Sequence, residues 1–304
     1  MIMGIDVGGT AAKMAFIDHA GVIHERFEVN TCPDHYQTPI LDSVLAGINA
    51  FLSKAKEAPE GIAVSATGQI DMEQGVVIGT NGAIPGYEGT RFVDVINERY
   101  GVPCIAINDA NAAALGECFA GKARGYKNVV MVTLGTGVGG GIVLDSKIFG
   151  GTRGIAGEIG HFTLYQDGPK CACGKRGCLE MFASTSALTR KAREMTGEKE
   201  LNGIDVFARA ALRDAAMLSL LDRWTDDISA GISGLVHIFN PEMILIGGGV
   251  SAQEKLLIEP LRKKILDQTM PRFAENLRIE AASLGNDAGM IGAAAYWLQK
   301  YHGS

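Results

Sequence analysis

Residues 1–17 read MIMGIDVGGTAAKMAFI and residues 128–144 read NVVMVTLGTGVGGGIVL, and both follow one pattern. Each segment has a short apolar run, a turn built from two glycines and a threonine, and a second run rich in small and apolar residues. Short apolar runs on either side of a glycine turn are typical of paired, buried strands. Because internal self-similarity is the signature of a repeated structural unit, we predict a duplicated α/β fold.

The two turns are candidate phosphate sites. They consist of Gly8, Gly9 and Thr10 in the first segment and of Gly135, Thr136 and Gly137 in the second. Such turns present backbone N–H groups to phosphates, and Asp6 could hold Mg²⁺ through water. An ordinary hairpin with glycine at positive φ explains either turn alone equally well. Two loops that face each other across a cleft would hold a nucleotide's polyphosphate from both sides, so the duplication favours a nucleotide site.

A cysteine-rich stretch, residues 157–180, reads GEIGHFTLYQDGPKCACGKRGCLE. Thiolates and imidazole are zinc ligands, and Cys171, Cys173, Cys178 and His161 supply the four that a tetrahedral ion needs. The Cys-x-Cys spacing is tighter than in common zinc motifs, and a disulfide pair or unlinked core thiols are the alternatives. Three clustered cysteines cannot all pair with one another, which favours a metal site.

Two further strand ends carry candidate site residues. The strand at 104–107 runs into Asn108 and Asp109, where a helix begins, and ligands of open α/β sheets lie at the carboxyl ends of strands. Asp109 is either the N-cap of that helix or a carboxylate placed to accept a hydroxyl proton. After the strand at 243–246, three consecutive glycines offer a flat backbone for a planar base or form a plain strand-to-helix turn.

Periodicity and turn residues predict the remaining elements. We expect further strands at 22–29, 61–66, 147–149 and 278–281, and helices at 39–54, 92–100, 111–120, 185–196, 203–214, 217–239, 254–270 and 288–299, the last capped by Asp287. Residues 80–89 are expected to form a loop, and long loops at strand ends often bind ligands.

Composition excludes several classes of protein. Hydrophobic residues make up 47% and charged residues 20% of the 304 residues, as in ordinary globular proteins. The 28 basic and 34 acidic residues give a net charge of −6, and no basic run offers a footprint for nucleic acid. We see no signal peptide and no run of 18 apolar residues that would span a membrane. The scattered cysteines Cys32, Cys104 and Cys118 suit a reducing compartment, so we expect a cytoplasmic protein.

Taken together, the motifs resemble those of the ROK family, a bacterial group of sugar kinases and sugar-sensing repressors. The resemblance covers essentially the whole chain. Asp6–Thr10 with Lys13 resembles the first phosphate motif of the family, and Leu134–Gly141 the second. Asn108–Asn111 resembles its catalytic segment, while Glu158–His161 followed by Cys171–Glu180 is the most specific match.

The resemblance implies a duplicated actin-like fold, also described as hexokinase-like or ribonuclease H-like, with two domains around a cleft. The smaller N-terminal domain is expected at 1–118 and the larger one at 119–304, with the zinc-binding insertion at 157–180. The C-terminal helix, 288–300, is expected to pack back onto the N-terminal domain.

The resemblance also implies a role for each matching residue. Asp109 is the catalytic base, which takes the proton from the sugar hydroxyl that attacks the γ-phosphate of MgATP. The residues expected to bind the sugar are Gly68, Asn81, Asn108, Asp109, Glu158, His161 and Glu180. Those expected to bind ATP and its phosphates are Asp6, Gly8, Gly9, Thr10, Lys13, Gly135, Thr136, Gly137, Gly247, Gly248 and Gly249. The ligands of a structural Zn²⁺ are His161, Cys171, Cys173 and Cys178.

The implied activity is ATP-dependent phosphorylation of a hexose at its 6-hydroxyl, with glucose as the leading candidate. N-acetylmannosamine, a β-glucoside and fructose are alternative acceptors, because the short loop between His161 and Cys171 and the threonine at 185 depart from the family pattern. A sugar-sensing regulator without turnover is the alternative class. Repressors of the family carry a DNA-binding segment ahead of the first phosphate motif, whereas only five residues precede Asp6. Since the family commonly forms dimers, we expect a homodimer.

Overall fold

The computed structural model describes residues 1–80 and 84–303 of the chain. It divides into two compact units. Unit 1 comprises Met1–Gly125, Gly141–Gly157 and the segment from Asn286 onward, and unit 2 comprises Tyr126–Gly140 and Glu158–Gly285. The domain boundary predicted between residues 118 and 119 stays a prediction.

The first five-stranded sheet has the order β3-β2-β1-β4-β7. Its strands are β1 (Ile2–Val7), β2 (Ala11–Ile17), β3 (Ile23–Asn30), β4 (Gly61–Ala66) and β7 (Cys104–Asn108). The first three form an antiparallel meander, and β4 and β7 continue the sheet parallel to β1. The glycine turn after β1 therefore lies at the same sheet edge as the carboxyl ends of β4 and β7.

The second five-stranded sheet repeats this arrangement in the order β10-β9-β8-β11-β12. It contains β8 (Val129–Leu134), β9 (Val138–Leu144), β10 (Lys147–Ile148), β11 (Met243–Gly247) and β12 (Arg278–Ala281). Again a meander of consecutive strands is followed by two strands parallel to the first of them. The duplicated α/β fold predicted from the sequence is confirmed; the boundary between the units crosses β9, between Gly140 and Gly141.

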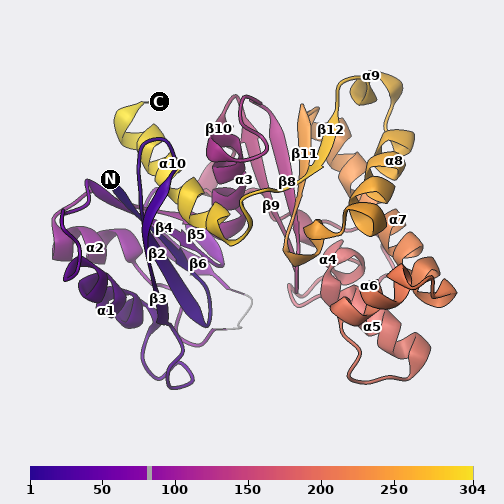
Figure 1. The fold of residues 1–304 in the computed structure, drawn as a ribbon, viewed down its shortest axis with the longest axis horizontal. Coiled ribbons are helices and arrows are strands. Elements are labelled where there is room, and N and C mark those ends of the chain that lie inside the picture. The colour runs from indigo at the N-terminus through magenta and orange to yellow at the C-terminus, as the bar shows by residue number, and fades with distance from the viewer. Residues whose placement is uncertain (81–83, 304) are drawn as a thin grey trace. The chain divides into compact units, whose positions relative to one another are not determined.

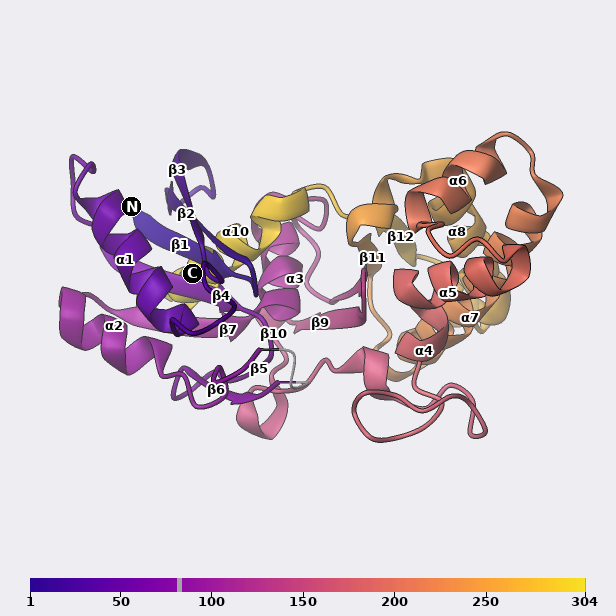
Figure 2. The ribbon, with the colours of Figure 1, turned by 90° about the horizontal axis from the view of Figure 1, so that it is seen from below.

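Helices cover both faces of the first sheet in unit 1 (Figure 1, Figure 2). On one face lie α1 (Ile40–Leu52) and α2 (Phe92–Tyr100), and on the other α3 (Asp109–Ala120) and α10 (Ala288–His302). Successive residues of β1 point to opposite faces of the sheet, so β1 contacts helices on both sides. Met3, Ile5 and Val7 belong to the core cluster that includes α1, whereas Gly4 lies against Met290 of α10.

Two short strands, β5 (Gln69–Asp71) and β6 (Val76–Gly79), pair as a separate antiparallel sheet. Sequence analysis predicted no strands there, because strands of three and four residues are too short to show an alternating pattern.

The remaining helices belong to unit 2. They are α4 (Glu180–Ala183), α5 (Thr185–Thr196), α6 (Gly203–Ala211), α7 (Ala215–Phe239), α8 (Glu259–Gln268) and α9 (Pro271–Ala274). The single helix predicted over 254–270 is wrong in detail. Residues Glu254–Ile258 form a π-helical turn, and Pro260 lies in the first turn of α8, where its missing N–H is tolerated. The helix ends before Pro271, which disfavours helical backbone in the preceding residue.

Two predicted helix caps also need correction. Asn108, rather than Asp109, is the N-cap of α3, because its side-chain oxygen accepts hydrogen bonds from the backbone N–H groups of Ala110 and Asn111. Asp287 stands at the N-cap position of α10 but makes no capping bond. Its carboxylate instead forms a two-pronged ion pair with Arg26 of β3.

Helices α3 and α10 approach closely through glycines. A Cβ on Gly292 would lie 1.6 Å from the carbonyl oxygen of Ala112, and one on Gly116 would lie 2.4 Å from that of Ala288. Both obstacles are backbone atoms, which cannot rotate away.

Within the described parts of the chain, no helix combines the length and apolar character needed to cross a membrane.

We expect Gly292→Ala to destabilise unit 1 by about 1–3 kcal/mol, because the added methyl group overpacks a backbone contact. Gly234→Ala, at an exposed position of α7 where nothing lies within 4 Å of the new Cβ, is the matched control. It should leave stability unchanged or raise it by up to about 1 kcal/mol through helix propensity. Urea unfolding of both variants measures the difference, and equal midpoints would contradict the close packing.

Candidate functional site

In unit 1, three chain segments meet at the carboxyl edge of the first sheet. The register pairs Val7 with Ala66 and Ala66 with Asn108, so β1, β4 and β7 end level with one another. The segments that follow them, Gly8–Thr10, Thr67–Gly68 and the start of α3, therefore begin at one edge. This edge is where ligands bind in open α/β sheets.

Asp109 is held at the first turn of α3 by short-range hydrogen bonds. Its Oδ1 accepts a hydrogen bond from the backbone N–H of Ala110 (2.7 Å) and another from Nδ2 of Asn108 (3.0 Å). The same Nδ2 donates to the carbonyl oxygen of Gly68 (2.9 Å). Asn108 thus ties together Gly68, Asp109 and the N-terminus of α3, whose dipole favours a negative charge at this point.

Asp6 and Tyr87 lie in the same region of unit 1. Asp6 accepts a hydrogen bond from the hydroxyl of Ser65 (2.8 Å). Burial raises the pKa of Asp6, while the Ser65 bond and the charge of Lys13 oppose that rise. Burial also raises the pKa of Tyr87, and the negative charges of Asp109 and Asp6 raise it further. The carboxylates of Asp6 and Asp109 therefore both disfavour ionisation of the Tyr87 phenol.

Tyr87 was missed by sequence reasoning, since it lies in the segment predicted as a loop. It is 2% exposed, and its hydroxyl has no hydrogen-bond partner among residues 1–80 and 84–303. An aromatic residue within a glycine-rich loop was the available signal. Asn81, predicted to bind the sugar, lies outside the described residues.

The first glycine turn is tightly hydrogen-bonded. The N–H of Gly8 donates to the carbonyl of Ala11 (2.9 Å), and the backbone N–H of Thr31 donates to the carbonyl of Thr10 (3.0 Å). Lys13 lies on β2 directly opposite Asp6 of β1. The predicted residues Asp6, Gly8, Gly9, Thr10 and Lys13 therefore belong to one hairpin of unit 1.

The second glycine turn, in unit 2, contacts Glu180. The N–H of Gly135 donates to the carbonyl of Gly137 (3.0 Å), which makes the turn tight. The Glu180 Oε2 accepts a hydrogen bond from the N–H of Val138 (3.1 Å). A Cβ on Gly137 would lie 2.4 Å from the same oxygen, so glycine is needed for this contact.

Gly247, Gly248 and Gly249 reach the sheet edge that carries this second turn. In the register of β11 and β8, Gly247 pairs with Thr133. Gly248 has φ +89°, and a Cβ there would lie 2.1 Å from the carbonyl oxygen of Leu134. Only glycine fits this conformation and this contact. The side of Gly249 that a Cβ would occupy faces open space.

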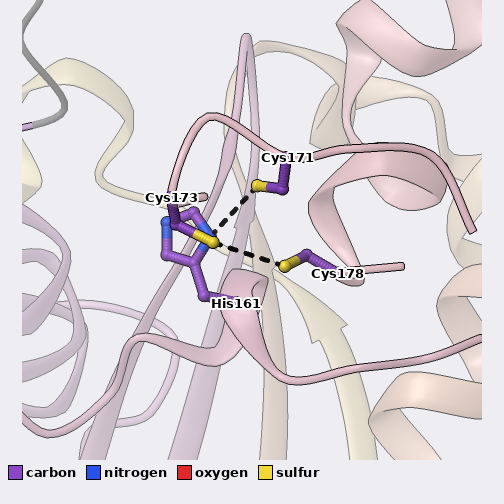
Figure 3. A group of neighbouring side chains, drawn as sticks. All are labelled: His161, Cys171, Cys173 and Cys178. Carbon is purple, nitrogen blue, oxygen red and sulfur yellow. Dashed lines mark hydrogen bonds between the residues drawn. The ribbon is translucent and has the colours of Figure 1, made fainter. Parts of the chain in front are cut away.

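Four predicted metal ligands form one cluster in unit 2 (Figure 3). The candidate ligand atoms of His161, Cys171, Cys173 and Cys178 all lie within 4.8 Å of one another. His161 Nδ1 is 3.6 Å from Cys171 Sγ, and the Sγ atoms of Cys173 and Cys178 are 3.5 Å apart. Tetrahedral Zn–S bonds of about 2.3 Å would separate sulfur ligands by about 3.8 Å. The thiols are unlinked, and their spacing fits a tetrahedral metal ion.

The backbone of the cysteine loop is shaped for this cluster. The N–H of Cys171 donates to the carbonyl of Lys175 (2.8 Å), and that of Gly174 donates to the carbonyl of Cys171 (3.0 Å). Gly174 and Gly177 both have positive φ, which other residues rarely adopt. The backbone N–H of Lys175 lowers the pKa of Cys173, whereas burial raises the pKa of Cys171 and of Cys178.

His161 faces two ways. Its Nδ1 points to the cysteine cluster, and its Nε2 lies 4.0 Å from a carboxylate oxygen of Glu158. The 3-10 turn Ile159–His161 packs on β9, since a Cβ on Gly160 would lie 2.2 Å from the carbonyl oxygen of Val138. Glu180 contacts the N–H of the same Val138. Glu158, His161 and Glu180 are the residues of unit 2 predicted to bind sugar. Glu180 contacts Val138 directly, and Glu158 and His161 flank the short turn that packs on it.

Comparisons with known proteins agree with these features. The model of the ROK family matches residues 2–300. The chain is 39% identical to a glucokinase of Halalkalibacterium halodurans, over 98% of this chain and 94% of that protein. It is 33% identical to a glucokinase of Thermotoga maritima, over 99% and 98%. A crystal structure of a ROK family glucokinase from Streptomyces griseus, in complex with glucose and AMPPNP, matches with a TM-score of 0.81 at 30% identity, covering 96% of this chain and 97% of that one.

We expect purified protein to contain about one zinc ion per chain, because four protein ligands complete a tetrahedral shell. Cys178→Ser should lose most of this zinc, whereas Cys104→Ser should keep it; both cysteines are buried, but only Cys178 lies in the cluster. Elemental analysis of the wild type and both variants provides the measurement. Equal zinc in the two variants would contradict the ligand assignment.

Proposed function

Because the chain belongs to the ROK family, we propose that it is an ATP-dependent sugar kinase that phosphorylates a hexose at its 6-hydroxyl, with glucose as the leading acceptor. The observation that carries this proposal is the position of Asp109. Its carboxylate lies at the first turn of α3, at the carboxyl edge of the sheet where the Gly8–Thr10 turn also begins. A base and a phosphate-binding turn at one edge are what phosphoryl transfer to a hydroxyl requires.

Asp109 acts as the general base in this mechanism. It accepts the proton of the 6-hydroxyl as that oxygen attacks the γ-phosphorus, and the bond from phosphorus to the bridging oxygen of ADP breaks. The hydrogen bonds from Ala110 and Asn108 fix the carboxylate before the sugar arrives. Little further covalent chemistry is needed, because positioning and charge neutralisation supply most of the catalysis.

The glycine turns and Lys13 position the nucleotide. The N–H groups of Gly8 and Gly135 donate to the carbonyls of Ala11 and Gly137 and shape the two turns, and the other backbone N–H groups of Gly8–Thr10 and Gly135–Gly137 bind the phosphates. Gly247–Gly249 receive the adenine ring. Asp6 would hold, through water, the Mg²⁺ that accompanies ATP and supplies charge neutralisation.

The sugar hydroxyls are bound by residues that can donate and accept hydrogen bonds. In unit 1 these are Gly68, Asn81 and Asn108, and in unit 2 Glu158, His161 and Glu180. The Nε2 of His161 suits this role because Nδ1 faces the cysteine cluster. The cluster would hold a structural Zn²⁺ through His161, Cys171, Cys173 and Cys178, a ligand set that would leave no position for substrate.

The cellular setting is part of the same proposal. Unlinked thiols throughout the chain suit the reducing cytoplasm, and the family resemblance favours a homodimer. N-acetylmannosamine, a β-glucoside and fructose are the alternative acceptors. A sugar-sensing regulator is the second candidate class, and it would need neither a base at position 109 nor two phosphate-binding turns.

We expect a coupled assay of ADP release to show turnover with glucose at a higher kcat/KM than with N-acetylmannosamine, mannose, fructose or cellobiose. Product analysis should identify the 6-phosphate. A higher kcat/KM for another sugar would make that sugar the acceptor. If no sugar of the panel supports ADP release, the kinase assignment is contradicted.

Asp109→Asn should lower kcat at least about 100-fold, since a positioned general base contributes roughly 10²–10⁴ to the rate. The Kd for glucose should change little, because the amide keeps the hydrogen-bonding shape of the carboxylate. Asp42→Asn is the matched control: Asp42 is exposed and likewise lies in the first turn of a helix of unit 1. Steady-state kinetics and glucose titration measure both effects, and substantial turnover by Asp109→Asn would rule out the base assignment.

A further inference from the structure

The first glycine of each turn has the same kind of hydrogen-bond partner. Gly8 follows β1 and Gly135 follows β8, so the two glycines occupy corresponding positions in the duplicated fold. The carbonyl of Gly8 accepts a hydrogen bond from the hydroxyl of Thr31 (3.0 Å). The carbonyl of Gly135 accepts one from the hydroxyl of Thr185 (2.7 Å).

The two threonines do not correspond to each other in the duplicated pattern. Thr31 directly follows the third strand of its meander, is fully buried, and comes 23 residues after its glycine. Thr185 begins α5, 50 residues after its glycine. The same contact has thus been reached from unrelated parts of the chain, which indicates that the glycine carbonyl needs it.

The hydroxyl of Thr185 does not cap α5. Ser184 is the N-cap of α5, and its side chain already accepts the N–H of Ala187 (3.1 Å). The backbone N–H of Thr185 also donates to the carbonyl of Gly135 (2.9 Å). Both donors of Thr185 are therefore directed at the turn.

A bound carbonyl fixes the N–H on the other side of the same peptide group. In a planar trans peptide the C=O and the following N–H point in opposite directions. Binding the carbonyl of Gly8 therefore orients the N–H of Gly9, and binding that of Gly135 orients the N–H of Thr136. Each of these N–H groups then points away from its threonine.

Glycine makes this restraint necessary. A turn of glycines is free to rotate its peptide groups, and ordering them costs more entropy than for other residues. A Cβ on Gly135 would meet no atom closer than 4.0 Å, so no side-chain packing restrains that peptide group. The threonine bonds supply the missing restraint.

We propose that Thr31 and Thr185 are positioning residues, which hold the N–H groups of Gly9 and Thr136 in the orientation that binds the phosphates of the nucleotide. This rests on the proposed function of the two turns as nucleotide-binding elements. Neither threonine touches the reacting atoms in this scheme, and each acts through the glycine whose carbonyl it binds.

The test uses Thr31→Val and Thr185→Val, which remove the hydroxyl but keep the shape, and Thr→Ser at each position, which restores it. Thr196→Val is the matched control, because its hydroxyl donates to the carbonyl of Ala192 (3.0 Å) at the far end of the same α5. Calorimetric titration of the intact protein with ATP and with adenosine separates phosphate binding from base binding, and kinetics give the KM for ATP and for glucose.

Thr31→Val should weaken ATP binding about fivefold, the effect of losing one hydrogen bond of average strength. Thr185→Val should weaken it by a smaller factor, because the backbone N–H of residue 185 still donates to the carbonyl of Gly135. Adenosine affinity and the KM for glucose should stay within about twofold of wild type, because neither threonine contacts the base or the sugar in this scheme. The serine variants and Thr196→Val should bind ATP like wild type. If a valine variant fails to fold, the alanine variant at that position replaces it in the same comparison.

Wild-type ATP affinity in both valine variants would overturn the proposal, as would an equal loss of ATP and adenosine affinity. Either result would leave the kinase assignment intact, since that depends on sugar-dependent ADP release by the wild type. Conversely, a wild type that phosphorylates no sugar would end the kinase assignment, and the ATP and adenosine titrations would still decide the role of the threonines. A wild type that binds no ATP would overturn the proposal.

Discussion

The hydrogen bond from the N–H of Val138 to the carboxylate of Glu180 is the interaction on which the candidate site of unit 2 depends. Val138 begins β9 directly after the second glycine turn, and Glu180 follows Cys178 by two residues. On its carbonyl side Val138 is packed against Gly160, the neighbour of His161. One residue of the sheet thus contacts both segments that carry the metal ligands. Val138 therefore links three parts of the site: the second glycine turn, the segment that carries His161 and the cysteine loop.

This connection joins the cluster of predicted metal ligands to the candidate nucleotide turn. The cysteine loop, Cys171–Cys178, is held by a few backbone hydrogen bonds, and its two glycines, Gly174 and Gly177, have positive φ. Such a loop has little apolar surface to bury, so its order must come from another source, and a closed four-ligand metal site supplies folding free energy directly. A fixed loop fixes Glu180, and Glu180 in turn binds the first N–H of β9. The cluster would therefore act on the turn through protein contacts.

Sequence reasoning predicted the duplicated fold because strand length, glycine position and hydrophobic runs are local properties that the chain repeats. It also identified the four clustered ligands, since their residue types and spacing already restrict the chemistry. It considered Asp109, and not Asn108, as a possible cap of α3, whereas Asn108 has the extended backbone that lets its side chain reach two N–H groups. The sequence shows only that Tyr87 is an aromatic residue in a glycine-rich loop; its burial and the effect of Asp6 and Asp109 on its pKa depend on residues that are distant in sequence. Likewise, the Arg26 and Asp287 pair joins residues 261 positions apart.

The direct measurement is amide hydrogen exchange of the segment 135–141 with and without removal of metal by a chelator, followed by mass spectrometry. If the cysteine loop positions the turn through Glu180, the Val138 amide should exchange faster once the metal is removed, while the turn at 8–10 in unit 1 keeps its rate. Unchanged exchange of Val138 in folded, metal-free protein would show that the turn does not depend on the cluster, and the link between them would have to be abandoned.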